Sequence, residues 1–125
     1  MTYELEFFRT VSVTDTDIDD IMCTALEGGI THWCDYAEVL GGYLGEYAHE
    51  QISRDGVLVL RDSETGEYFT LTKEKFLKGL ETACKENIYS EYEWCNGSEI
   101  DTFQVDADIA DAIVQIALFG DIIFG

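Results

Sequence analysis

Four aspartates near the N-terminus carry the residue types of a calcium site. The run Asp15-x-Asp17-x-Asp19-Asp20 places carboxylates at alternating positions, as the first ligands of an EF-hand loop do. That loop also needs glycine at its sixth position and glutamate at its twelfth, where this chain has Asp20 and Leu26. Aspartates are equally typical of the first turn of a helix, where they face the positive end of its dipole. We therefore expect these acids to begin a helix and not to bind calcium.

Cysteines and histidines are the other residues that could bind a metal or act as nucleophile and base. On one helix, Cys23 and Cys34 would lie about 16 Å apart along the axis, too far for two zinc–sulfur bonds of about 2.3 Å. A cysteine nucleophile needs a base within hydrogen-bond reach, and no spacing brings His32 or His49 to a cysteine. The remaining cysteines are Cys84 and Cys95. Without a CxxC pair or a signal peptide, we expect reduced, buried thiols in a cytoplasmic protein.

Catalytic and phosphate-binding motifs are absent from the sequence. The GxSxG, HExxH, P-loop and GxGxxG patterns do not occur. The pairs Gly28-Gly29 and Gly41-Gly42 have no neighbouring lysine or arginine and sit among acids, which would repel phosphate. The sequence therefore predicts no enzyme activity, no metal and no cofactor.

The net charge of −19, from 26 acids and 7 bases, is the unusual feature of the composition. Residues 1–53 and 86–125 hold all of the excess acid, whereas residues 54–85 carry equal numbers of acids and bases. Such a chain lacks the basic footprint that nucleic acid or an anionic membrane would require. A basic protein surface is the natural complement, and a soluble acidic surface without a specific partner is the plainer alternative.

The pattern of residues 15–40 predicts one long helix that runs through Gly28-Gly29. Its apolar residues recur at steps of three and four over most of the circumference, which is typical of a buried helix. The remaining stripe is polar, and each of its charges is negative; its acids are Asp17, Asp20, Glu27, Asp35 and Glu38. On a straight helix these carboxylates would form a ridge with steps of roughly 5 to 6 Å, close to the roughly 7 Å phosphate spacing of one nucleic-acid strand.

Alternating patterns and caps define the other expected elements. They are a strand within 2–13, a shorter helix within 43–52, strands at 57–61 and 67–71, and helices at 73–85 and 107–119. Residues 87–105 are ambiguous between a hairpin turning at Asn96-Gly97 and a long aromatic loop. Residues 122–124 form an apolar tail that docks as a strand or is covered by another subunit. The whole predicts one compact α+β domain, residues 1–125, with a small antiparallel sheet, a long buried N-terminal helix, an amphipathic middle helix and a mostly buried C-terminal helix.

Three stretches, TALEGGITHWC, GGYLGEYAHEQISRDG and ADIADAIVQIALFGDIIFG, resemble segments of small acidic proteins encoded by phages and prophages of gut bacteria. The resemblance covers most of the chain, and its motifs are structural, so it carries over no functional residue. It implies a context, because small phage proteins of this size often block a host defence system such as a CRISPR-type one. Several of those inhibitors imitate nucleic acid, and others sequester nucleotide signals in oligomeric pockets.

Two hypotheses follow for the function. The first is a non-enzymatic phage-type inhibitor whose acidic ridge mimics nucleic acid and binds a basic site on a host defence or nucleic-acid-binding protein. A second acidic patch, Glu91, Glu93, Glu99 and Asp101, would assist. The second hypothesis is an oligomeric pocket for a nucleotide-type signalling molecule. Its aromatic wall would be Trp33, Tyr36, Tyr43, Tyr47, Tyr89, Tyr92 and Trp94, with His32 and His49 as polar contacts. A small phage assembly protein that oligomerises through its apolar C-terminal tail is a further alternative.

Overall fold

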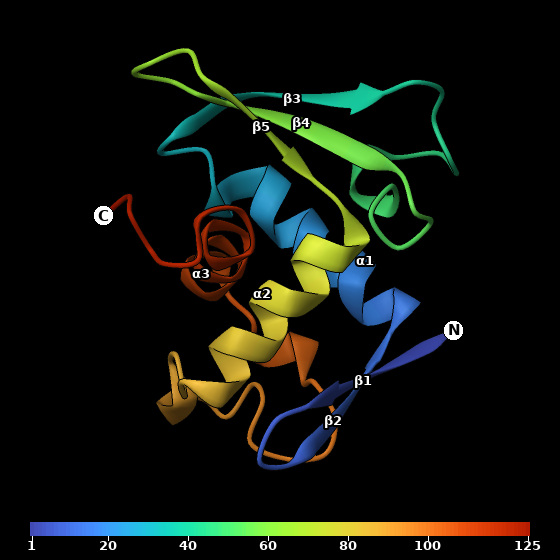
Figure 1. Cartoon of the computed structure of the whole chain (residues 1–125), viewed down its shortest axis with the longest axis vertical. Helices are drawn as coiled ribbons and strands as arrows, with labels where there is room; N and C mark the ends of the chain where they lie inside the picture. Colours follow the sequence, from blue (N-terminus) through green and yellow to red (C-terminus); the bar gives the residue numbers. More distant parts are fainter.

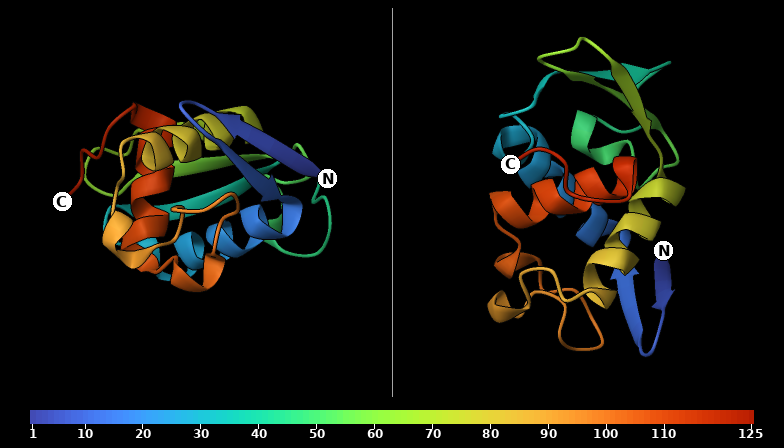
Figure 2. Two further views of the ribbon diagram at one scale, coloured as in Figure 1. Left: turned by 90° about the horizontal axis from the view of Figure 1, so that it is seen from below. Right: turned by 60° about the vertical axis from the view of Figure 1, so that its left-hand side comes forward.

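Two small antiparallel sheets lie at opposite ends of the long axis, with three α-helices between them (Figures 1 and 2). The structure is a computed structural model that describes residues 1–125. The strands are β1 (Thr2–Glu6), β2 (Thr10–Thr14), β3 (Cys34–Leu40), β4 (Val57–Asp62) and β5 (Tyr68–Leu71). The helices are α1 (Asp15–Thr24), α2 (Lys73–Lys85) and α3 (Ala107–Phe119). The expected α+β class with antiparallel strands is confirmed.

Side-chain caps begin all three helices, as the sequence predicts. The Thr14 and Thr72 hydroxyls and the Asp106 carboxylate each accept a hydrogen bond from the backbone N–H three residues on. At the other end of α3, Gly120 has φ +78°, which suits glycine and ends the helix. The expected bounds of α2 and α3 are both confirmed.

The core is one cluster of 27 buried apolar residues to which all three helices and both sheets contribute. Within α3 eight of the thirteen residues are buried, so the C-terminal helix is mostly buried as expected. Helices α2 and α3 approach closely because Gly79 has no side chain: a Cβ there would lie 2.6 Å from the Ala117 backbone. Helix α1 buries only Ile18, Ile21 and Met22, and the expectation of an N-terminal helix buried on most sides is not met.

The prediction of one helix from residue 15 to 40 is wrong. Helix α1 ends at Thr24, a single π-helical turn follows at Ala25–Gly29, and the chain then reverses into strand β3. Strand β4 explains the reversal: its Leu58 and Leu60 are fully buried, and it pairs with a strand on each side. Residues of β3 supply one of those neighbours, so pairing in the sheet overrides the helical periodicity of the sequence.

Residues 2–13 do not form one strand. They form the hairpin β1–β2, in which Tyr3 pairs with Val13 and Leu5 with Val11. A turn at Phe7–Arg9 reverses the chain, and odd-numbered residues keep the same face on both strands, so the apolar alternation resumes in phase after the interruption at Phe8 and Arg9. Periodicity alone could not separate a long strand from a hairpin here.

The prediction of a shorter helix within 43–52 is wrong, and the ambiguous residues 87–105 adopt mostly irregular structure. Within 43–52 only a short 3₁₀ turn forms, Ala48–Glu50, and the Gln51 side chain binds the backbone of Leu44 and Tyr47 in place of helical hydrogen bonds. Residues 87–105 form a loop with two 3₁₀ turns, and no hairpin forms at Asn96-Gly97.

A disulfide joins Cys84 at the end of α2 to Cys95 in the loop. The expectation of four reduced thiols is therefore wrong for this pair, while Cys23 and Cys34 are free. The sequence offered no motif for the bond, because the eleven-residue spacing of these two cysteines is not a CxxC or other recognised pattern.

The C-terminal tail packs on its own chain as irregular structure and not as a strand. The Gln115 amide oxygen accepts hydrogen bonds from the backbone of Ile123 and Phe124, each at 2.8 Å. The Phe124 ring stacks on Trp33 with 4.9 Å between centroids. Part of the apolar surface that suggested oligomerisation is thus covered within one chain, although Ile123 stays 56% exposed.

Candidate functional site

The structure disperses the predicted acidic ridge. Asp17 and Asp20 lie on α1, Glu27 lies on the π-helical turn, and Asp35 and Glu38 lie on β3. A straight row of five carboxylates therefore does not exist, and the molecule has no helical ridge that could match the phosphate spacing of a nucleic-acid strand. Glu91 lies in the first 3₁₀ turn of the loop and Glu93 directly follows it, and both are exposed.

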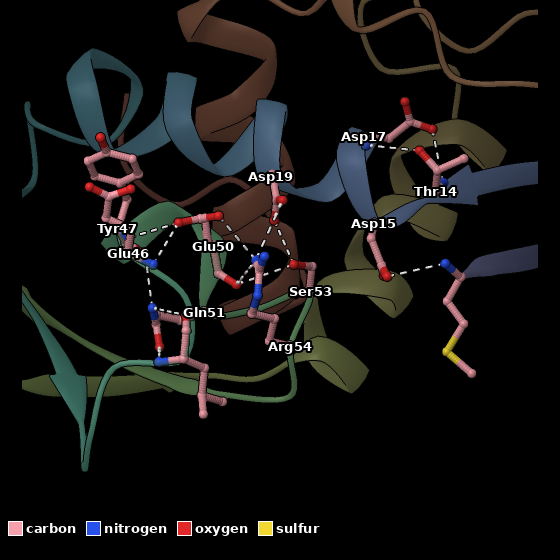
Figure 3. A network of polar contacts seen from close by, with 12 residues as sticks. Thr14, Asp15, Asp17, Asp19, Glu46, Tyr47, Glu50, Gln51, Ser53 and Arg54 are labelled. Carbon is pink, nitrogen blue, oxygen red and sulfur yellow. Dashed lines mark hydrogen bonds and ion pairs between the residues drawn. The ribbon is translucent and has the colours of Figure 1, made fainter.

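Several of the N-terminal acids are engaged in structural contacts (Figure 3). Asp17 accepts a hydrogen bond from the Thr14 backbone N–H at 3.0 Å and completes a capping box. Asp19 accepts from the Ser53 hydroxyl at 2.6 Å, and the Arg54 guanidinium lies between Asp19 and Glu50. These contacts position α1 against residues 48–55, which is a structural role.

Arg61 neutralises Asp35. The guanidinium donates two hydrogen bonds to the carboxylate, each at 2.9 Å, and holds the pKa of Asp35 below its usual value. On the same strand, Glu38 is exposed and forms no ion pair. Of the ridge residues on β3, only Glu38 therefore keeps a free charge.

The fold brings acids from both predicted patches together at the end opposite the β3–β5 sheet. Asp20 accepts a hydrogen bond from the Thr102 hydroxyl at 3.3 Å, which joins α1 to the loop that carries Glu99 and Asp101. Asp17 and Glu99 line the same hollow of about 340 Å³. We call Asp17, Asp20, Glu99 and Asp101 the composite acidic face.

No lysine or arginine forms an ion pair with the composite acidic face. None of the ion pairs in the structure includes one of its four carboxylates. Arg9 is near the loop, but its guanidinium donates to the backbone oxygens of Gly97, at 2.6 Å, and Cys95. The four carboxylates of the face are therefore unpaired, while Arg9 holds the loop that carries Glu99 and Asp101 in place.

An exposed phenylalanine lies beside the composite acidic face. Phe103 is 98% exposed, and it lines a shallow hollow of about 520 Å³ together with Glu93, Glu99 and Asp101. Its neighbours Ile100 and Val105 are buried and anchor the loop in the core. A large apolar side chain ringed by carboxylates resembles the anchor and polar rim of a protein-binding surface. The exposure of Phe103 could not be predicted from the sequence, because residues 87–105 are ambiguous there between a hairpin and a loop.

The aromatic residues of the second hypothesis do not meet in one pocket. Trp33 and Trp94 are buried in the core, where the Trp94 indole donates to the Ile88 backbone oxygen at 2.7 Å. Tyr36 lies on β3, and Tyr43 and Tyr47 lie on the segment after it, at the end of the molecule that carries the β3–β5 sheet. There Tyr47 stacks on His49. Tyr89 and Tyr92 lie together on the loop of residues 87–105, with 6.2 Å between ring centroids.

A buried polar network surrounds Asp111 on α3. The carboxylate accepts hydrogen bonds from the Trp33 indole and from the Gln115 amide, and it binds His32 Nε2 at 2.8 Å. Gln115 is fully buried and carries the network on to the C-terminal tail. A signal existed in the sequence: Asp111 and Gln115 are polar at i and i+4, in a helix whose one other polar residue is Asp108 in the first turn. The network has no nucleophile bonded to His32, and its geometry orders the tail.

A hollow of about 420 Å³ beside this network is lined by His32, Tyr89, Asp108 and Asp111 among others. Burial raises the pKa of the Tyr89 phenol, and the carboxylates of Asp108, Asp106 and Asp111 raise it further. The hollow is therefore electronegative, and a phosphate group placed in it would be repelled.

No group of three or more His, Cys, Asp or Glu side chains is arranged to hold a metal ion. None of the helices has both the length and the apolar composition that crossing a membrane would require. Comparison of the chain with protein-family models, curated proteins and solved structures finds no match in any of the three.

Proposed function

We propose that this protein is a non-enzymatic binding protein whose composite acidic face engages a basic site on another protein. The observation that carries the proposal is the meeting of Asp17 and Asp20 on α1 with Glu99 and Asp101 on a distant loop. Residues from two distant parts of the sequence thus form one surface whose carboxylates have no ion-pair partner. This surface replaces the straight ridge that the sequence predicted and that the structure does not contain.

The charge repulsion on the face and the exposed apolar area beside it favour a macromolecular partner over a small ligand. Like charges held near one another on one face destabilise the free protein, and a surface of lysines and arginines relieves that repulsion on binding. Phe103 adds apolar area that only a partner of protein size can cover. Charge complementarity of this kind speeds association and makes it sensitive to salt.

Nucleic-acid-binding proteins are the first partners to test. Their channels are lined with lysine and arginine, and the face can compete with phosphates for the same cations without a matched linear spacing. The resemblance to small acidic phage proteins points to host defence proteins within that class. Sequestration of a nucleotide is not proposed, since the hollow next to Tyr89 is lined by acids.

The test compares two triple variants that change the net charge equally. The first, Asp20→Asn/Glu99→Gln/Asp101→Asn, neutralises the face, and the amide oxygen introduced at position 101 can still cap the second 3₁₀ turn. The control neutralises three exposed acids that accept no hydrogen bond: Glu64→Gln/Glu74→Gln/Glu86→Gln. Both proteins are used to capture partners from nuclease-treated bacterial lysate, and the affinity for each captured protein is then measured by calorimetry at several salt concentrations.

The face variant is expected to bind roughly 3- to 100-fold more weakly, since three exposed charge pairs contribute about 0.6 to 3 kcal/mol. The control is expected to lose only a few-fold, through the general reduction in charge. Competition with a short DNA duplex for the same partner tests whether the occupied site is one that holds nucleic acid. Equal weakening by the two triple variants would remove the composite acidic face from the binding site.

A further inference from the structure

The structure assigns a second interaction surface, at the opposite end of the molecule from the composite acidic face. We infer that the outer edge of strand β3 accepts an extended basic segment of another protein as an added antiparallel strand. The sheet order is β3–β4–β5, so β3 is an edge strand, and with seven residues it is the longest strand of the fold. It lies along the top of the molecule in Figure 1, with all three helices beneath the sheet.

Every other sheet edge is contacted by part of the same chain. On β1 the Glu6 backbone N–H donates to the Glu81 carboxylate at 3.0 Å. Strand β2 is flanked by the loop, where the Ser12 backbone N–H donates to the Ser98 backbone oxygen at 2.7 Å. On β5 the Lys75 ammonium donates to the Thr70 backbone oxygen at 2.9 Å. These contacts block addition of a further strand, as folded proteins usually require of their edges.

The β3 edge lacks such protection. Apart from the ladder to β4, the backbone of residues 35–40 has one contact, the Cys34 thiol with the Tyr36 backbone oxygen at 3.3 Å. No lysine or proline lies on the strand. An exposed ladder of backbone donors and acceptors without these blocking devices is the usual acceptor of a peptide strand.

The side chains on the outer face of the sheet indicate the sequence of the segment that would bind there. Tyr36, Glu38 and Leu40 share this face by strand alternation, beside the half-buried Val57 and Val59 of β4. Tyr36 is 44% and Leu40 59% exposed, so their apolar surfaces flank the free carboxylate of Glu38. An added strand would match this pattern with a basic residue opposite Glu38 and apolar residues two positions to either side.

Charge selects a foreign segment over a second copy of this chain. Residues 34–47 contain three acids, Asp35, Glu38 and Glu46, and no lysine, arginine or histidine. The nearest cation on the outer face, Arg61, is already bonded to Asp35. Pairing of β3 with β3 of another copy would set these acids against one another, within two proteins of net charge −19.

The experiment uses the full-length protein and the acetylated, amidated peptide Thr-Val-Thr-Lys-Thr-Val-Thr, followed by NMR titration and amide hydrogen exchange. Alternate amides of β3 should exchange quickly in the free protein and become protected on binding. A peptide with glutamate in place of lysine should bind at least fivefold more weakly, and a peptide with alternate N-methylated amides should not bind. Glu38→Lys should reverse the preference between the lysine and glutamate peptides, whereas Glu86→Lys, directly after the C-terminal end of α2, should leave it unchanged.

Three results would overturn the inference. One is the absence of shifts on β3 at millimolar peptide, and another is equal binding of the lysine and glutamate peptides to the unaltered protein. The third is protection of β3 amides without peptide together with a dimer in analytical ultracentrifugation, which would identify the occupant as a second copy. None of these outcomes bears on the composite acidic face, which lies at the other end of the molecule.

Discussion

Removal of the Asp111 carboxylate is the perturbation for which the structure makes the sharpest stability prediction. Asp111 lies within α3, and its two oxygens receive hydrogen bonds from Trp33 and Gln115 and contact His32 at 2.8 Å. In Asp111→Ala the buried Trp33 indole N–H loses its partner. Gln115 retains a bond to the tail, and His32 is exposed enough to be solvated by water.

The expected loss of stability is the sum of the effects on these three partners. An unsatisfied buried donor costs about 1 to 3 kcal/mol, and loss of the charge-assisted bonds adds about 1 kcal/mol, so Asp111→Ala should destabilise the protein by about 2 to 4 kcal/mol. Asp111→Asn keeps one oxygen for Trp33 and can turn its amide toward His32. That variant should therefore lose only about 1 to 2 kcal/mol. Against a total stability of about 5 to 15 kcal/mol, the alanine effect is large.

Urea unfolding at pH 7, followed by far-UV circular dichroism, measures both variants. Asp108→Ala is the matched control, because it removes an exposed aspartate from the first turn of the same helix. The control should change the free energy of unfolding by no more than about 1 kcal/mol through the helix dipole. If Asp111→Ala unfolded within about 1 kcal/mol of the unaltered protein, the carboxylate would not be the centre of the network.

Three further predictions concern other parts of the chain. Gly29→Ala should destabilise by about 1 to 3 kcal/mol, since its Cβ would lie 2.7 Å from a backbone oxygen of α3, while Gly28→Ala, with open space around it, should be neutral or slightly stabilising in the same urea assay. Reduction of the Cys84–Cys95 bond should lower the free energy of unfolding by about 3 kcal/mol through the entropy of the released loop, as measured with and without reductant. Because Arg61 lowers the pKa of Asp35 in the folded state, the pair stabilises above the unfolded value of about 3.9, and the contribution is lost as pH falls. The stability difference between the protein and Asp35→Asn should thus be full at pH 6 and shrink toward pH 3; a constant difference would contradict the assignment.

Local signals in the sequence predicted the parts of the fold that depend on neighbours along the chain. Thr72, Asp106 and Gly120 mark helix ends because a capping side chain or a left-handed glycine acts within one turn. The strands β4 and β5 were similarly evident from short apolar runs on both sides of a turn. These features require no knowledge of distant contacts.

The predictions from sequence failed where contacts between distant residues determine the structure. Residues 34–40 read as helix because apolar residues at steps of three and four also fit a strand with a bulge, and the register of β3 shifts between Cys34 and Tyr36. The Asp111 network joins residues far apart in the sequence, so no local pattern reports it. The disulfide closes a short loop of the chain, but its eleven-residue spacing matches no recognised motif. The composite acidic face was found only in part, since nothing in the sequence indicates that Asp20 lies next to Thr102.

The two tryptophans occupy different neighbourhoods, and this gives the molecule a pair of built-in optical probes. Trp33 stacks against Phe124 under the tail, whereas Trp94 is buried in the loop next to the disulfide cysteine Cys95. Disulfides quench nearby indole emission, so the two residues should differ in brightness and lifetime. Single-tryptophan versions of the protein would then report separately on docking at the loop and on loosening of the carboxyl terminus, without any attached dye.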